Sequence, residues 1–103
     1  MQLRVGQTLI SPVDPTTVVV VRAPAGEVEL TCGGAPLWDP KAGGSAPEAT
    51  ADPGQQAGTQ LGKRYVDEEV GLELLCAKPG TGTLAANGAP LPLKDAKPLP
   101  ASD

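Results

Sequence analysis

Short apolar runs separated by glycine and proline recur along the chain. Residues 17–21 are an unbroken run of Thr and Val, which predicts a strand that is covered on both faces. In residues 27–32 polar and apolar positions alternate strictly, so Val28, Leu30 and Cys32 are expected on the inward face of a second strand. The short Pro/Gly turn between the two runs predicts that they form a hairpin.

Similar patterns predict further strands in the rest of the chain. Asn87-Gly88 is a strong hairpin signal, because both central positions of a type I′ turn require positive φ. No window of the sequence carries the sustained apolar stripe of an amphipathic helix. We therefore expect an all-β domain, a small barrel or sandwich of about six or seven short strands. The other predicted strands are residues 3–5, 8–10, 63–66, 72–76, 81–86 and 89–91.

Two segments lack these strand patterns. Residues 33–60 are mostly Gly, Ala and Pro, a composition that buries too little apolar surface to offset the entropy of ordering. They are expected to form a long mobile insertion between two halves of a sheet. Residues 94–103 carry Pro98 and Pro100 and are expected to form an extended C-terminal tail. The β domain itself would then span residues 1–93.

Two pairs of segments resemble each other. Residues 28–32 and 72–76 share an aliphatic-Glu-Leu-x-Cys pattern, which places the two cysteines at equivalent strand ends. Residues 30–37 match residues 84–91, with Leu, Gly, Ala, Pro and Leu in common. The two alignments use different offsets, so they cannot both mark one duplication. Chance repetition in a Gly/Ala/Leu-rich chain explains the matches equally well.

The apolar side chains available for a core are small. The chain has no Phe, one Trp and one Tyr, so Val and Leu must build the core, with Ala between them. Aromatic side chains usually supply the largest buried areas, and a small domain without them is marginally stable. Self-association would bury more apolar surface, so we expect a homo-oligomer or a small subunit of a larger enzyme complex.

The charge distribution excludes several classes of partner. The net charge is −4 and the basic residues are scattered, which argues against nucleic-acid binding. The longest apolar run stops at Arg22, far short of the roughly 20 residues that a membrane helix needs. The first residues lack the apolar stretch of a secretory signal, so a cytoplasmic location is expected. The scarcity of Ile, Asn and Phe beside Gly, Pro and Ala indicates a bacterium with a GC-rich genome.

The sequence offers no recognisable catalytic constellation. The absence of histidine excludes Ser-His-Asp and Cys-His arrangements. The three carboxylates of residues 67–69 could raise one another's pKa, but such a cluster is more often a solvated turn. The Lys-Arg-Tyr segment at 63–65 could hold an anion or form an edge strand blunted by charge. Residues 80–82, Gly-Thr-Gly, lack the lysine and the helix of a phosphate loop. We expect no enzymatic activity.

Cys32 and Cys76 are the remaining candidates for chemistry, and three interpretations stay open. They can be small buried hydrophobic residues, with both thiols pointing inward. They can form a disulfide that closes the long insertion, although a cytoplasmic location counts against this. They can also belong to a metal or redox site.

The third interpretation comes with a family resemblance. Cys32-Gly33-Gly34-Ala35-Pro36 is similar to the Cys-Gly knuckle of rubredoxin-, desulforedoxin- and zinc-ribbon-type proteins. In those families the knuckle carries two cysteines, and its glycines let backbone amides approach the sulfur atoms. This chain has one cysteine at each place. The resemblance implies an iron or zinc site completed across a dimer interface by Cys32 and Cys76 of two chains.

Trp38 is the only indole and follows Leu37 at the start of the Gly/Ala/Pro-rich segment. The two residues can fold back as a lid on the open end of the sheet, or they can anchor a protein partner. The function expected from the sequence is a non-catalytic accessory or protein-binding β module. The alternatives are a small metal or redox protein using the two cysteines, and a small-ligand-binding barrel.

Overall fold

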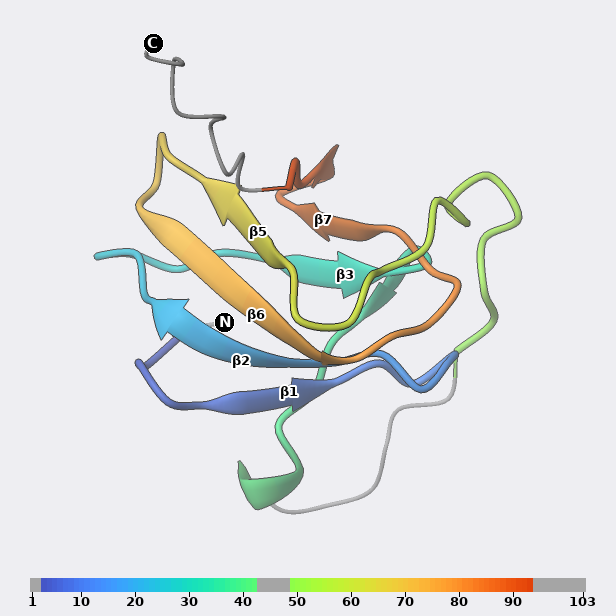
Figure 1. The fold of residues 1–103 in the computed structure, drawn as a ribbon, viewed down its shortest axis with the longest axis horizontal. Coiled ribbons are helices and arrows are strands. Elements are labelled where there is room, and N and C mark those ends of the chain that lie inside the picture. Colours follow the sequence, from blue (N-terminus) through green and yellow to red (C-terminus); the bar gives the residue numbers. More distant parts are fainter. Residues whose placement is uncertain (1–2, 43–48, 94–103) are drawn as a thin grey trace, which may run out of the picture.

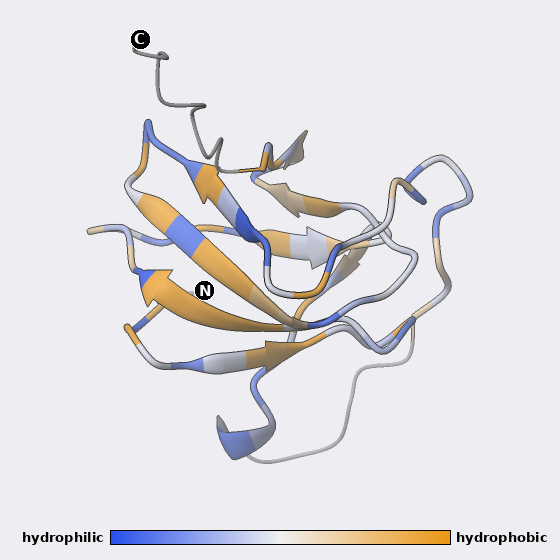
Figure 2. Cartoon of the chain, viewed as in Figure 1, coloured by the Kyte–Doolittle hydropathy of each residue, from blue (hydrophilic) through white to orange (hydrophobic). Residues whose placement is uncertain are grey.

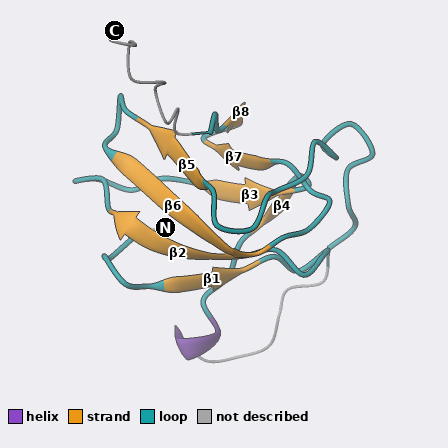
Figure 3. Cartoon of the chain, viewed as in Figure 1, coloured by secondary structure: helices purple, strands orange, loops and turns teal. Residues whose placement is uncertain are grey.

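The computed structural model describes residues 3–42 and 49–93, which form an all-β domain (Figure 1). Two four-stranded antiparallel sheets face each other, and one 3-10 turn is present (Figure 3). Sheet A has the strand order β1-β2-β6-β5 and sheet B the order β4-β3-β7-β8. The elements are β1 (Thr8–Ile10), β2 (Thr17–Arg22), β3 (Leu30–Cys32), β4 (Ala35–Pro36), η1 (Pro40–Ala42), β5 (Arg64–Asp67), β6 (Leu72–Lys78), β7 (Leu84–Ala86) and β8 (Ala89–Pro90).

The all-β prediction is confirmed, but the predicted hairpin of β2 with β3 is wrong. These strands lie in different sheets, because β2 pairs with β1 and β6, while β3 pairs with β4 and β7. The residues between them carry the chain from one sheet to the other instead of turning it back. The strand count is also higher than expected, since Ala35–Pro36 forms β4 inside the segment predicted to be an insertion. The predicted strand at residues 3–5 is wrong, because these residues are irregular and lead into a turn at Gly6.

Both edges of sheet A are joined to chain segments that continue sheet B. Beyond β4, Trp38 forms an antiparallel bridge with Ile10 of β1, and beyond β8, Leu93 forms one with Tyr65 of β5. The first bridge has two backbone hydrogen bonds, of 2.9 and 3.0 Å, in opposite directions. The bridges close the sandwich on both sides and cover edges that would otherwise be open to strand addition.

The core fills the space between the sheets and is aliphatic, as the composition predicts. Along β2, Val18 and Val20 point inward and are fully buried. Leu74 and Cys76 of β6 lie opposite them on the same inward face. Tyr65 is the one aromatic side chain of the core cluster. Each of these side chains contributes roughly 1.5–3 kcal/mol when fully buried.

The two halves of the domain repeat the same strand pairings. In the β1–β2 pair Thr8 lies opposite Val19, and in the β5–β6 pair Arg64 lies opposite Leu75. Arg64 follows Thr8 by 56 positions in the chain, and Leu75 follows Val19 by the same number. The β2–β6 pairing is centred on Val19 and Leu75, and it has an irregularity at each end. The halves are therefore related by an approximate two-fold axis that passes between Val19 and Leu75.

The hairpins of sheet B repeat as well, with an offset of 54 positions. Residues 30–37 and 84–91 form β3–β4 and β7–β8 in the same register. Both turns have positive φ at their two central positions, 61° and 84° for Gly33-Gly34 and 51° and 85° for Asn87-Gly88. The offset differs from that of sheet A because the link between β6 and β7 is two residues shorter than the link between β2 and β3.

This symmetry separates the two resemblances seen in the sequence. The match of residues 30–37 to 84–91 marks a true structural repeat, whereas the match of residues 28–32 to 72–76 does not. The N–H groups of Gly6 and Gly62 donate to the carbonyls of Val20 and Cys76 at 2.8 and 2.9 Å, so Cys76 is the counterpart of Val20. The 54-position offset of sheet B makes Ala86 the counterpart of Cys32. The two cysteines therefore do not occupy equivalent positions in the two halves.

The structure also differs from the prediction at both ends of the segment 33–60. Its beginning forms β4 and the bridge at Trp38. Its end is hydrogen-bonded to the β6–β7 link, where Ala57 N–H donates to Thr83 Oγ1 at 2.8 Å and Thr59 N–H to the Gly80 carbonyl at 3.0 Å. Residues 43–48 of this segment and the predicted tail at 94–103 lie outside the described residues.

Candidate functional site

The two thiols lie deep between the sheets, one on each. Cys32 of β3 is 0 % exposed and Cys76 of β6 is 1 % exposed, and both are free. The prediction that both thiols point inward is thus confirmed. The Cys32 thiol lies 3.8 Å from both carboxylate oxygens of Asp14, and the Cys76 thiol donates to the Lys78 carbonyl at 3.2 Å.

The surroundings of the thiols keep them protonated. Burial raises the pKa of Cys32; hydrogen bonds with Thr16 and Ser11 lower it by a smaller amount, and the negative charge of Asp14 adds a still smaller rise. Burial also raises the pKa of Cys76. The thiolate is the form that attacks electrophiles and binds metals, so both cysteines lie in surroundings that suppress this chemistry. Within residues 3–42 and 49–93 no group of three or more His, Cys, Asp or Glu side chains could hold a metal ion.

Asp14 organises the loop that closes this end of the core. Its carboxylate accepts hydrogen bonds from the N–H of Thr16 at 2.9 Å and from the N–H of Gly82 at 2.6 Å. Burial would raise the pKa of Asp14, but these backbone hydrogen bonds lower it overall. Sequence reasoning missed this residue, although Asp-Pro-Thr is a typical sequence for a side chain that caps its own turn.

The link between β6 and β7 fits against this loop only because it contains glycine. A Cβ atom at Gly82 would lie 2.7 Å from the Gly33 amide nitrogen and 2.9 Å from the Cys32 sulfur. At Gly80 it would collide with Thr16 Oγ1 and lie 2.7 Å from Asp14 Cγ. The Gly-Thr-Gly segment therefore serves close packing of backbone against the Asp14 loop.

The charged clusters singled out in the sequence do not converge on one site. Asp67 caps its own turn by accepting a hydrogen bond from the Glu69 N–H at 3.0 Å. Arg64 points outward and donates to Glu73 at 3.1 Å, whereas the neighbouring Tyr65 points into the core and accepts from the Gln60 N–H at 3.0 Å. Consecutive residues of a strand point to opposite faces, so these side chains cannot enclose a common ligand.

Leu37 and Trp38 have different positions. Leu37 belongs to the core cluster and is 2 % exposed. Trp38 is half-buried, and its indole Nε1 is buried without a hydrogen-bond partner among the described residues. Because residues directly opposite in an antiparallel pair share a face, the bridge to Ile10 places Trp38 at the outer side of sheet A.

The outer face of sheet A is the most unusual surface of the domain. Sheet A lies in front of β3 and β7 in Figure 1, and its two central strands are hydrophobic along most of their length in Figure 2. The register puts Val19 and Leu75 side by side at its centre, on the opposite side from Val18 and Cys76. We call this surface the outer face; its apolar members are Ile10, Val19, Val21, Trp38, Val66, Leu75 and Ala77.

The outer face remains accessible to solvent. Val19, Val21 and Leu75 keep partial exposure, and Ala77 is exposed. The unbroken apolar run of β2 predicts a strand covered on both faces. Within the described residues its inner face is fully buried, whereas its outer face is only partly covered, which leaves an apolar sheet surface in contact with solvent.

No protein-family model, curated protein or solved structure matches the chain. Among the described residues, no helix is long and apolar enough to cross a bilayer. The function must therefore be inferred from the chain's own geometry.

Proposed function

We propose that this protein is a non-catalytic, protein-binding β module that docks through the outer face of sheet A. The observation that carries the proposal is the contrast between the two faces of β2 and β6. Their inner faces are sealed in the core, where β6 holds Cys76 opposite Val18 of β2, and their outer faces leave the aliphatic side chains of Val19 and Leu75 partly exposed. The partner can be another chain of an enzyme complex or a second copy of this chain.

The alternatives receive less support from the geometry. A metal shared between two chains would have to reach Cys32 and Cys76, which are buried inside one domain at 0 % and 1 % exposure. A small-ligand barrel would need space between the sheets, where the core side chains lie. Trp38, by contrast, flanks the outer face, and Trp is enriched at the centres of protein interfaces.

The test compares matched substitutions on the two sheets. Val19→Thr and Leu75→Thr remove apolar surface from the outer face without changing charge. Thr31→Ser is the control, because Thr31 is half-buried at the centre of sheet B, opposite Ala85. The full chain, immobilised and exposed to a lysate of its source cells, should retain a stoichiometric partner, which is then purified for titration.

We expect the double variant Val19→Thr/Leu75→Thr to weaken binding of that partner at least tenfold and the control to leave it unchanged. If a second copy is the partner, the same variant should dissociate the oligomer in sedimentation analysis. Equal affinity of the double variant and the control, with no change in oligomeric state, would refute the proposal.

A further inference from the structure

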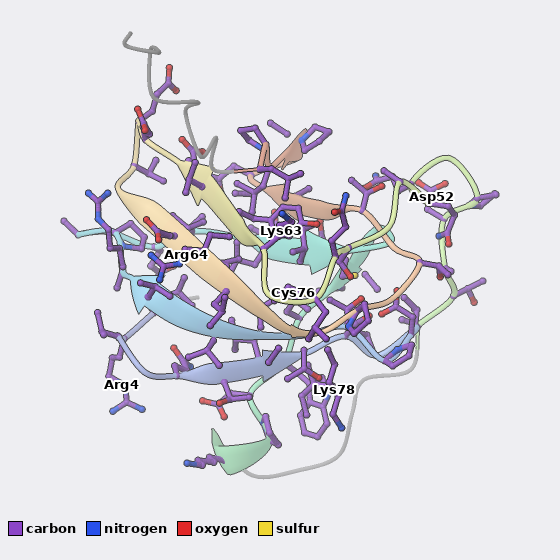
Figure 4. The ribbon with its side chains drawn as sticks, in the orientation of Figure 1. Arg4, Asp52, Lys63, Arg64, Cys76 and Lys78 are labelled. Atoms are coloured by element: carbon purple, nitrogen blue, oxygen red, sulfur yellow. The ribbon has the colours of Figure 1, made fainter. Side chains whose placement is uncertain are left out.

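The outer face has a basic rim. Arg22, Arg64 and Lys78 surround its apolar centre and are exposed. In Figure 4 Arg64 lies over one end of β6, and Lys78 projects from the other end. Among the described strand residues that the register places on this face, Glu73 is the acidic one; it is 1 % exposed and paired with Arg64 at 3.1 Å. The exposed charged side chains at these strand positions are thus all basic, although the whole chain carries a net charge of −4.

This charge pattern disfavours a second copy as the occupant. Arg22 and Lys78 are counterparts about the approximate two-fold axis, so they lie at equal distances on either side of the Val19–Leu75 pair. Two copies packed face to face would bring these basic rims together. Glu73, the acidic residue among the strand positions of this face, is buried and cannot reach across to offset them. Like charges juxtaposed at an interface oppose association, so a partner with acidic flanks fits better.

The closed edges of sheet A restrict the shape of the partner. The bridges at Trp38 and Leu93 already occupy one position on the outer edge of each of β1 and β5, strands of only 3 and 4 residues, so little free edge is left for a partner strand. The partner must instead pack on side chains. A helix laid on a sheet is a common way to bury such an apolar surface.

The spacing of the basic side chains sets the length of the partner. At about 3.3 Å per residue, Arg22 and Lys78 lie roughly 10 Å from the central Val19–Leu75 pair, in opposite directions along the strands.

We infer that the outer face binds an amphipathic helix whose apolar stripe is flanked by acidic residues. This inference rests on the proposed function and names the chemistry of its partner. The stripe covers Val19 and Leu75, and acidic groups near the two ends of the helix pair with Arg22 and Lys78. A helix of about 14 residues spans the roughly 20 Å between these side chains.

The experiment uses the full chain and a synthetic 18-residue helical peptide with a leucine stripe flanked by glutamates. A second peptide has lysine in place of every glutamate. Titration followed by NMR should show that the glutamate peptide binds at least tenfold more tightly and shifts the amide signals of β2 and β6. Its binding should weaken as salt is raised, because the rim contacts are exposed.

Charge reversal provides the decisive comparison. The double variant Arg22→Glu/Lys78→Glu should lose at least tenfold in affinity for the glutamate peptide and gain affinity for the lysine peptide. Thr31→Glu, which adds a negative charge on sheet B, should leave both affinities nearly unchanged. The amide spectrum of each variant establishes that it is folded.

Three results would overturn the inference, and they bear differently on the proposed function. Equal binding of both peptides would mean that the outer face docks apolar segments without charge selection, and the proposed function would stand. A dimer that Val19→Thr/Leu75→Thr dissociates would identify a second copy as the occupant, and the proposed function would again stand. Binding of neither peptide would remove the helix partner, and the lysate experiment would then decide the proposed function separately.

Discussion

At the scale of single residues, the best-defined polar contact is the carboxylate of Asp14. It accepts backbone hydrogen bonds from Thr16 and Gly82 beneath the loop that seals the end of the core. These bonds tie the β1–β2 loop to the β6–β7 link and bring the carboxylate beside the Cys32 thiol. The cluster combines a nucleophile with a carboxylate, but its geometry serves the closure of the core.

Asp14 should make stability depend on pH. The pKa of Asp14 is lower in the folded state than its ordinary value of 3.8. The contribution of the ionised carboxylate to the free energy of unfolding is therefore complete above pH 3.8 and is lost as the pH falls through the folded pKa. Asp14→Asn should cost about 1–3 kcal/mol at pH 7. The difference between wild type and variant should shrink below pH 4 in urea unfolding. A difference that stays constant down to pH 2 would show that the charge contributes nothing.

The close approach at Gly82 gives a second prediction. Gly82→Ala places a methyl group against the Gly33 amide and the Cys32 sulfur, so it should reduce the free energy of unfolding by about 1–3 kcal/mol. Gly26→Ala is the control, because a Cβ there meets nothing within 4 Å. The control should be neutral or slightly stabilising in the same urea experiment. Equal stability of the two variants would contradict the packing described here.

At the scale of elements, the two hairpins of sheet B show which local signals determine structure. Asn87 has φ 51° and accepts a hydrogen bond from the Glu29 N–H at 3.0 Å. Its counterpart Gly33 has φ 61° and no side chain. The same turn is thus made from two different residues that both tolerate positive φ.

Asn87→Gly should therefore be tolerated, with a loss of at most about 1 kcal/mol for the missing side-chain hydrogen bond. Asn87→Val should cost a further 1–2 kcal/mol or so, because a β-branched residue is strained at positive φ. Thermal unfolding of the two variants measures this difference. If Val were as stable as Gly at this position, the turn would not have the conformation reported.

Other elements were not predictable from local signals. Residues 27–32 alternate in polarity and were expected to pair with residues 17–21, yet only Leu30–Cys32 forms a strand and it lies in the other sheet. Alternation reports which side of a strand is buried but does not report which strand lies beside it. The role of Asp14 was likewise hidden, because its partner Gly82 lies 68 positions away.

At the scale of the whole molecule, the two halves are interdependent. The central pairs β2–β6 and β3–β7 both join the first half to the second, and the core cluster draws on both. Each half alone would leave its longest strand unpaired on one side and half of the core open to water.

Fragments 1–48 and 49–103 should therefore be unfolded separately and should refold when mixed. Two-dimensional NMR of each fragment should show narrow amide dispersion, and an equimolar mixture should recover the spectrum of the full chain. A fragment that gives a dispersed spectrum as a monomer would show that half of the domain is a folding unit by itself.

The sequence by itself determined the all-β class, the aliphatic core, the inward direction of both thiols and the Asn-Gly hairpin, because each depends on local alternation, composition or turn conformation. Only the tertiary structure decided which strands pair, which of the two internal resemblances is a repeat, and that the Val run of β2 is only partly covered on one side. A run of valines has the same pattern whether its outer face is covered by its own chain or open to a partner. Pairing between distant segments makes that choice, and it leaves the outer face of sheet A partly exposed.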